Sequence, residues 1–308
     1  MSRRKLCIGT VNFGMPYGIV PESGQVSAED AAAIVGAALE RGIDRFDTAA
    51  GYGAAETVLG NGLKQAGAAK SKVISKLPPI GEDGLDGEGK SELRDAAEQS
   101  CRRLGVETLN GLLVHRTADL LGDDGKRLWK LLEEFKAEGI AQRIGVSLYE
   151  AEEIDAVLER FAPDIVQLPL SIADQRLLHS GHLALLADRG VEVHARSIFL
   201  QGVLLTDPVD TDRIFSAASE SMAALDTLAR EVDMDRLSLC LGFTSRLPEI
   251  AQIVVGANSE EQLHEIADAA GKTVDIDQAA AAACAWNDPA LLNPSNWPAL
   301  QADATAEA

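Results

Sequence analysis

Two hydrophobic periods alternate along the chain. Short apolar runs recur throughout, and between them apolar residues repeat at the three- and four-residue spacing of an amphipathic helix, as in KSELRDAAEQSCRRL and KRLWKLLEEFKAE. The apolar runs predict eight strands, at Leu6–Thr10, Arg45–Asp47, Val73–Lys76, Leu109–Val114, Ile144–Ser147, Ile165–Leu168, Val191–Arg196 and Ile253–Val255.

Glycines mark the ends of four predicted helices. Gly42, Gly105, Gly139 and Gly190 each follow a helical pattern and precede an isoleucine or a valine. Because a helix commonly ends in a residue with positive φ, these four are interpreted as C-caps that lead into strands. The segment Ser27-Ala-Glu-Asp predicts the N-terminus of a further helix.

Strict alternation of strands and helices indicates a parallel sheet with right-handed crossovers. Eight such units over about 250 residues favour a closed (β/α)8 TIM barrel, predicted as a single domain over residues 1–308 with its core at about 6–269. An open doubly wound sheet is the alternative, but no G-x-G-x-x-G follows the first strand.

Three segments fall outside the regular alternation. The long interval between the seventh and eighth strands predicts additional helices inserted after strand seven, including Phe215–Val232. Gly81–Lys90 is expected to be an acidic, glycine-rich mobile loop. Residues 270–308 are expected to lie partly over the barrel mouth, with a frayed tail at 303–308.

Composition narrows the class of function. The 308 residues include 28 Lys and Arg against 48 Asp and Glu, and the net charge of −20 opposes binding to nucleic acid or an anionic membrane. No apolar stretch approaches the ~20 residues of a membrane span and no signal sequence is recognisable, so a cytoplasmic protein is expected. The four separated cysteines suggest neither a metal site nor a disulfide framework, and we expect mostly buried thiols, at Cys7, Cys101, Cys240 and Cys284.

Four polar residues fall at or just after the ends of consecutive predicted strands: Asp47, Tyr52, Lys76 and His115. Each has an ordinary explanation when taken alone, as a helix cap, a solvated side chain or a packing residue. In a barrel, however, the ends of all eight strands meet at one rim, where active sites lie. The four residues are therefore predicted to form one site.

These side chains suit proton transfer at a carbonyl oxygen. A tyrosine with an ordinary pKa of about 10 is a weak proton donor near neutrality, but a nearby ammonium stabilises its phenolate. Lys76 can supply that charge, and Asp47 can hold the ammonium in place. His115 can direct the substrate oxygen through a hydrogen bond.

The segment FDTAAGYG, followed by ISK and LLVH at the next strand ends, resembles the aldo-keto reductase family, and the resemblance extends from about Ile8 to Ala269. It implies an NAD(P)(H)-dependent oxidoreductase that transfers a hydride between a carbonyl compound and its alcohol. The carbonyl compound would be an aldehyde, a ketone, or a sugar in its lactol or lactone form. Tyr52 is then the general acid, assisted by Asp47, Lys76 and His115. The small residues around Tyr52 are expected to let cofactor and substrate approach the backbone closely.

The same resemblance implies a set of cofactor-binding positions. The nicotinamide end would be held by Ser147, Gln167 and Arg196. The pyrophosphate would be held through the backbone around Ser197, Phe199, Gly202 and Leu204. The adenosine end would be held by Gly256, Asn258, Ser259, Gln262 and Glu265.

This chain departs from the family pattern in several of these positions. Gly256 and Gln262 stand where members that select NADP often carry Lys and Arg, so the resemblance implies NADP while the residues leave NAD open. Leu148 replaces a common Asn, and Ile266 replaces an Asn that binds adenine. The hairpin with which the family often begins is expected to be absent, since about five residues precede the first strand.

Arg196 stands where an aromatic side chain usually stacks on the nicotinamide. Strand periodicity predicts that Arg196 shares the inward face with His194. Its planar guanidinium is predicted either to stack on the nicotinamide ring or to turn away and pair with an acid such as Glu192.

The pattern also leaves open what contacts the substrate. Phe13, Tyr17, Trp286 and Trp297 lie on segments that could reach the barrel mouth, with packing an equal alternative for the last two, whereas Trp129 is expected in the core. A small-molecule carbonyl or sugar substrate and a monomer or weak homo-oligomer are expected. Two alternative functions remain on this fold: a cofactor-binding sensor or accessory protein, and a cofactor-assisted isomerase or lyase.

Overall fold

Eight parallel strands close into a barrel in sequence order in the computed structural model, which describes residues 5–18, 24–68, 70–81, 84–206, 213–272 and 275–297. The predicted (β/α)8 barrel is confirmed, and the open doubly wound sheet is excluded. The strands are β1 (Leu6–Gly9), β2 (Arg45–Asp47), β3 (Lys72–Leu77), β4 (Gly111–Val114), β5 (Ile144–Ser147), β6 (Ile165–Pro169), β7 (Glu192–Arg196) and β8 (Ile250–Val255).

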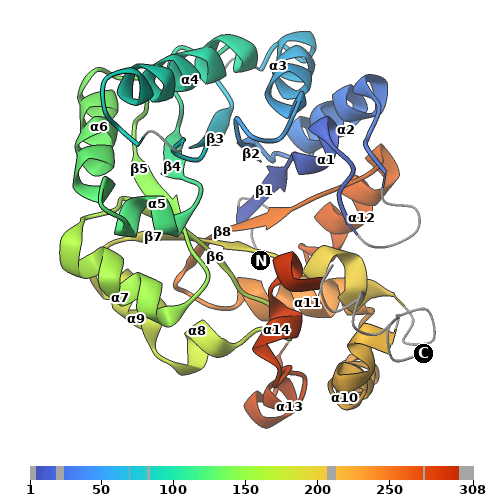
Figure 1. Cartoon of the computed structure of the whole chain (residues 1–308). Coiled ribbons are helices and arrows are strands. Elements are labelled where there is room, and N and C mark those ends of the chain that lie inside the picture. The colour runs from blue at the N-terminus through green and yellow to red at the C-terminus, as the bar shows by residue number, and fades with distance from the viewer. Residues whose placement is uncertain are drawn as a thin grey trace.

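Helices surround the strands on the outside of the barrel (Figure 1). In the first half of the chain they are α1 (Val11–Gly14), α2 (Ala28–Glu40), α3 (Ala55–Gln65), α4 (Glu88–Leu104), α5 (Thr117–Leu121) and α6 (Gly125–Ala137). The following ones are α7 (Ala151–Arg160), α8 (Arg176–His179), α9 (His182–Asp188), α11 (Arg236–Ser245) and α12 (Glu260–Ala269).

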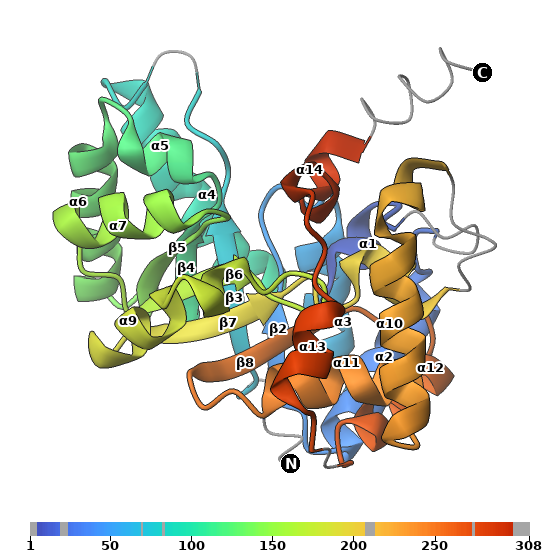
Figure 2. The same ribbon diagram turned by 90° about the horizontal axis from the view of Figure 1, so that it is seen from below.

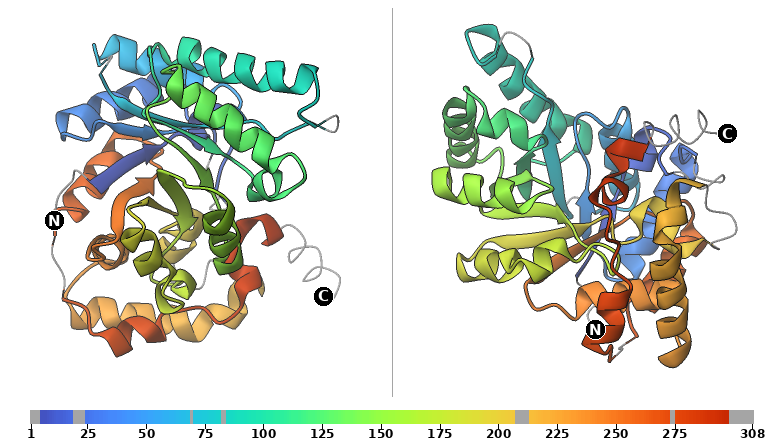
Figure 3. Two further views of the ribbon diagram at one scale, coloured as in Figure 1. Left: turned by 90° about the vertical axis from the view of Figure 1, so that its left-hand side faces the viewer. Right: turned by 60° about the horizontal axis from the view of Figure 1, so that its bottom comes forward.

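The additional helices expected after the seventh strand are present. Between β7 and α11 lie the 3-10 helices η2 (Leu200–Leu205) and η4 (Arg213–Ala218) and the helix α10 (Ser219–Glu231). The C-terminal segment adds α13 (Gln278–Ala283), α14 (Pro289–Leu292) and η5 (Pro294–Asn296). Helix α13 packs beside α10 outside the barrel, as two further orientations make visible (Figures 2 and 3).

Local boundaries follow the sequence signals. The four predicted terminal glycines have φ values of +77°, +68°, +81° and +71°, in the left-handed region that favours glycine. At the start of α2, the Ser27 hydroxyl accepts a hydrogen bond of 3.1 Å from the Asp30 amide. Leu109 lies outside β4, although it forms an isolated bridge with Ala141.

The apolar core has two main parts. The larger lies between the barrel and its helices and contains Trp129, as expected, packed against Phe161 with 5.3 Å between ring centroids. The second joins the segment after β7 to the C-terminal segment, and here Phe215 contacts Trp286 and Trp297. Both tryptophans are thus packing residues. Phe13 is also fully buried, in the larger cluster.

Several sequence predictions meet the limits of the description. The acidic loop predicted at 81–90 ends earlier than expected, because α4 begins at Glu88. Residues 82 and 83 of this loop and the tail predicted at 303–308 lie outside the described residues. No strand precedes β1 in the part of the chain described, which begins at Lys5.

Three of the four cysteines are buried, and the fourth, Cys101, is partly buried. None of the described helices has the length and apolar character needed to cross a membrane.

Candidate active site

A cavity of about 640 Å³ opens at the C-terminal ends of the strands, and all four residues predicted to form one site line it: Asp47, Tyr52, Lys76 and His115. Asp47 ends β2, Lys76 lies near the end of β3, and His115 follows β4 directly. Tyr52 comes from the loop between β2 and α3. The parallel barrel places these strand ends at one rim, and this brings the four side chains together.

A buried ion pair forms the floor of the site. Lys76 Nζ donates hydrogen bonds to Asp47 Oδ1 at 2.6 Å and to the Thr48 carbonyl at 2.9 Å. The second carboxylate oxygen, Asp47 Oδ2, accepts a hydrogen bond of 2.7 Å from Gln167 Nε2 on β6. Both charged groups are thus fully engaged and fixed in position, as a buried pair requires.

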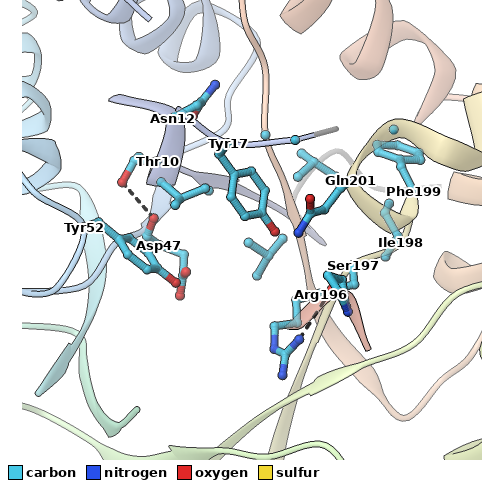
Figure 4. A pocket seen from close by; sticks show the side chains of 18 of the residues that line it. Thr10, Asn12, Tyr17, Asp47, Tyr52, Arg196, Ser197, Ile198, Phe199 and Gln201 are labelled. Atoms are coloured by element: carbon cyan, nitrogen blue, oxygen red, sulfur yellow. Dashed lines mark hydrogen bonds between the residues drawn. The ribbon is translucent and has the colours of Figure 1, made fainter. Parts of the chain in front are cut away.

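Tyr52 lies between this ion pair and His115. The Lys76 ammonium is 5.2 Å from the centroid of the Tyr52 ring, and the His115 ring meets the Tyr52 ring edge-on with 5.6 Å between centroids. Figure 4 shows Tyr52 and Asp47 facing the open pocket from one side, with Arg196 on the opposite side. The same view shows the Thr10 hydroxyl donating to the Asp47 carbonyl, which ties β1 to β2.

The electrostatic surroundings fix the charge states of two of these groups. Burial is the largest single influence and would lower the pKa of the Lys76 ammonium. The Asp47 charge, the neighbouring Tyr52 and the hydrogen bond to Asp47 together outweigh burial and raise that pKa above its ordinary value. Burial, reinforced by the Lys76 charge, lowers the pKa of His115 to about 4. Near neutral pH, Lys76 is therefore a cation and His115 a neutral imidazole.

The glycines around Tyr52 allow close packing of the backbone, and the predicted close approach of cofactor and substrate stays a prediction. A Cβ on Gly14 would lie 1.8 Å from the Tyr52 carbonyl oxygen, and one on Gly53 would lie 2.5 Å from the Gly14 carbonyl oxygen. Gly53 also has a φ of +56°. The glycines therefore let the loop after β1 pack directly against the backbone of the Tyr52 loop, whereas Gly51 is open on all sides.

Most residues predicted to bind the cofactor line the same cavity. They are Ser147, Gln167, Arg196, Ser197, Phe199, Gly202, Gly256, Asn258 and Gln262. Three others lie outside its lining. Leu204 is fully buried in the second apolar cluster, Ser259 caps α12 by accepting from the Gln262 amide, and Glu265 lies on the outer surface of that helix.

The backbone after β7 has an unusual conformation. Ser197, Leu200 and Gln201 have φ values of +60°, +45° and +54°, and Gly202 has +97°. Non-glycine residues rarely adopt this region, and such strain is concentrated at ligand-binding segments. Two amides of this loop already have partners, because Leu200 donates to the Ser197 carbonyl and Gly202 donates to the Phe199 carbonyl. Binding of a phosphate by the loop stays a prediction.

Arg196 lies against the Tyr149 ring and not against an acid. Its guanidinium lies 4.0 Å from the centroid of the Tyr149 ring, and its Nη2 donates to the Leu148 carbonyl at 3.2 Å. Arg196 forms no ion pair within the described residues. The proposed partner Glu192 instead bonds to His194 and Arg143. The pairing alternative is thus wrong, and stacking on a nicotinamide remains a prediction.

Sequence reasoning missed Asn12 and Tyr149. Asn12 Nδ2 donates to the Ala257 carbonyl and to Asn258 Oδ1, while its buried Oδ1 has no partner in the described structure. It links the loop after β1 to the predicted adenosine segment. Tyr149 directly follows Ser147 and Leu148, so its place after a strand end was the available signal. Tyr17 does reach the cavity, as do Pro294 and Ser295 of the C-terminal segment.

Comparisons with known proteins agree with this geometry. The model of the aldo/keto reductase family matches residues 5–286. A 6-dehydroglucose reductase of Agrobacterium fabrum is 26% identical over 286 residues, which cover 88% of this chain and 92% of that protein. An NADH-specific methylglyoxal reductase of Escherichia coli is 26% identical, with 73% of this chain and 77% of the relative covered. The holo form of an aldo-keto reductase of Bacillus halodurans superposes with a TM-score of 0.72 at 23% identity, covering 90% of this chain and 89% of that one.

The chain therefore belongs to the aldo/keto reductase family and is an NAD(P)H-dependent oxidoreductase that interconverts carbonyl and alcohol groups.

Proposed function

We propose that the protein interconverts a small aldehyde, ketone or sugar carbonyl with its alcohol, using Tyr52 as the general acid and base. The observation that carries the proposal is the position of the buried Lys76–Asp47 pair. The Lys76 ammonium lies 5.2 Å from the centroid of the Tyr52 ring, in the cavity that His115 also lines. A fixed cation next to a phenol favours the phenolate that proton donation leaves behind.

In the reductive direction, Tyr52 gives its hydroxyl proton to the substrate oxygen, so the phenol O–H bond breaks as the alcohol O–H bond forms. A bound reduced nicotinamide supplies the hydride, and thus both electrons, to the carbonyl carbon. The Lys76 ammonium stabilises the phenolate until Tyr52 regains a proton from solvent. The neutral imidazole of His115 orients the substrate oxygen through a hydrogen bond. Oxidation of an alcohol reverses each step.

The residues present fit a dinucleotide. The cavity continues from the four catalytic residues past Gln167 and the strained 197–202 backbone to Asn258 and Gln262. Asn12 also lines the cavity, and its buried Oδ1 has no hydrogen-bond partner in the described structure. Amide dipoles hold phosphate without adding charge, which suits a chain of net charge −20.

A sugar or other polyhydroxy carbonyl is the favoured substrate class. One relative, which matches 88% of this chain, reduces 6-dehydroglucose according to its name. Tyr17, Gln201 and Ser295 bring an aromatic ring and neutral hydrogen-bonding groups to the mouth of the pocket. Such a lining matches the alternating C–H and O–H surface of a sugar.

The test is to follow nicotinamide absorbance with a panel of aldehydes, ketones and sugars, using NADH and NADPH in turn and Tyr52→Phe as the matched control. Turnover by the parent and its loss in the variant support the proposal. Cofactor binding without turnover of any substrate would indicate a sensor. Product formation without net cofactor oxidation or reduction would indicate an isomerase or a lyase.

A further inference from the structure

A second buried charge cluster lies just behind the active site, on the helix side of β3. Glu56, in the first turn of α3, is only 2% exposed. Its Oε1 accepts a hydrogen bond of 2.6 Å from the Ser75 hydroxyl. Its Oε2 accepts from Arg103 of α4, at 2.8 Å from Nε and 2.6 Å from Nη2. Both oxygens of this carboxylate are therefore engaged with two different elements.

The two segments that Glu56 joins carry two catalytic side chains. Ser75 directly precedes Lys76 in β3, and because side chains alternate along a strand, Ser75 faces the helices while Lys76 faces the barrel mouth. Glu56 follows Tyr52 by four residues. Between them the Ala55 amide bonds to the Tyr52 carbonyl at 3.0 Å, which ties the loop to the first turn of α3.

We propose that Glu56 is a positioning residue: through its hydrogen bond to Ser75, it sets the separation between the Tyr52 ring and the Lys76 ammonium. The inference rests on the proposed role of Tyr52. Arg103 neutralises the buried carboxylate and fixes its orientation, while Ser75 transmits that position to β3.

The geometry separates this role from simple stabilisation. The Glu56–Arg103 ion pair holds α3 against α4, where a Cβ on Gly60 would lie 2.1 Å from the Arg103 carbonyl oxygen. The Ser75 hydrogen bond holds α3 against β3. Activity should therefore depend on the Ser75 bond and stability on the ion pair.

Two variants distinguish the two contacts. Ser75→Ala removes the bond to β3 and should lower kcat about tenfold while KM stays within about twofold, because a shift of about 1 Å in a catalytic group costs up to about a hundredfold. Glu56→Gln keeps a polar partner for both Ser75 and Arg103 but loses the charge. It should retain kcat within about threefold of the parent and lower Tm.

The pH profile supplies a readout that a merely structural role would leave unchanged. In Ser75→Ala, the basic limb of the kcat profile should move to higher pH by about half a unit or more, because a more distant ammonium stabilises a phenolate less. Ser75→Cys, which preserves volume but bonds more weakly, should show the same shift in smaller measure and covers the case in which Ser75→Ala fails to fold.

The matched control is Asp174→Asn. Asp174 is also 2% exposed and pairs with an arginine, Arg176, at 2.9 Å, but neither residue lines the cavity. This variant should lower Tm and leave kcat and its pH profile unchanged. If Ser75→Ala and Ser75→Cys behave in the same way as this control, Glu56 is purely structural and the inference fails. If instead Tyr52→Phe is itself fully active, the proposed function fails first.

Discussion

The two halves of the pocket offer different chemical groups to a ligand. The half built on β2, β3 and β4 contains a buried ion pair, and each charged atom has a side-chain or backbone partner within 2.9 Å. The half built on β7 and β8 offers a strained backbone at 197–202 and the neutral groups of Gly256, Asn258 and Gln262. Charge is thus fixed in the half proposed to transfer a proton, and backbone and neutral groups line the half proposed to bind the cofactor.

This difference has an energetic reason. Proton transfer creates charge on one oxygen, which a preorganised cation stabilises strongly in a water-poor site. A dinucleotide brings its own charges, and backbone amides can meet them at many points without a buried cation. We call the half built on β2, β3 and β4 the catalytic half and the half built on β7 and β8 the cofactor half. Substitutions in the catalytic half should therefore have large effects on turnover, and substitutions in the cofactor half should have smaller, graded effects on cofactor binding.

Tyr52→Phe should show the largest effect. Loss of the hydroxyl removes the proton donor and should lower kcat by about 10² to 10⁴, the usual contribution of a general acid. Cofactor affinity, measured by fluorescence titration, should remain within about twofold because the ring stays in place. A variant that keeps more than half of the parent turnover would remove Tyr52 from the chemistry.

Lys76→Met should affect both chemistry and stability. It should reduce turnover about as much as Tyr52→Phe, and it leaves the Asp47 carboxylate buried without its cation, at a cost of about 3–5 kcal/mol in unfolding free energy. Urea unfolding measures this loss. The double variant Lys76→Met with Asp47→Asn should recover most of the stability and none of the turnover. Recovery of turnover would show that Lys76 serves packing alone.

The sequence predicted the catalytic half more fully than the cofactor half. The positions of Asp47, Lys76 and His115 follow from strand ends, because a parallel barrel brings all such ends to one rim. The strain at Gln201 and the orphan Asn12 oxygen had no such signal, since backbone conformation and hydrogen-bond partners depend on contacts across the fold. The same holds for Gly53, whose neighbour Gly14 is distant in sequence.

His115 sharpens the comparison through pH. Its folded pKa of about 4 lies below its ordinary value, so between pH 6.5 and 4 the unfolded chain binds a proton that the folded chain does not. This contribution to stability is complete above pH 6.5 and is lost as pH falls to 4. His115→Gln should therefore show less loss of unfolding free energy across this range, by at most about 3 kcal/mol. Identical pH dependence in parent and variant would contradict a buried neutral imidazole.

Cofactor choice probes the other half. The described lining at the β8 end contains neither Lys nor Arg, so NADPH and NADH should differ in binding free energy by less than about 3 kcal/mol, roughly one or two charge-assisted hydrogen bonds. Fluorescence titration of both measures this difference. Gln262→Arg should raise the preference for NADPH about tenfold. A parent preference beyond about a hundredfold would place a phosphate-binding cation elsewhere in the chain.

Substitution of Arg196 should have the smallest effect, and this effect is on cofactor binding. Among the described lining residues, Arg196 is the one cation of the cofactor half. Stacked on Tyr149 and bonded to the Leu148 carbonyl, it faces the space opposite Tyr52 (Figure 4). A nicotinamide bound there is positive when oxidised and neutral when reduced, so the guanidinium should weaken binding of the oxidised form selectively.

Arg196→Tyr removes this repulsion while keeping a planar group. It should tighten oxidised relative to reduced cofactor by about 1 kcal/mol, or roughly fivefold in the ratio of dissociation constants. Arg196→Lys keeps the charge and should keep the parent ratio, which separates charge from shape. The repulsion makes the bound couple a stronger oxidant, and this favours alcohol oxidation on the enzyme while the overall equilibrium stays unchanged. An identical ratio in the parent and Arg196→Tyr would mean that the guanidinium does not act on the ring, and the cofactor half would then hold its ligand without any charged side chain.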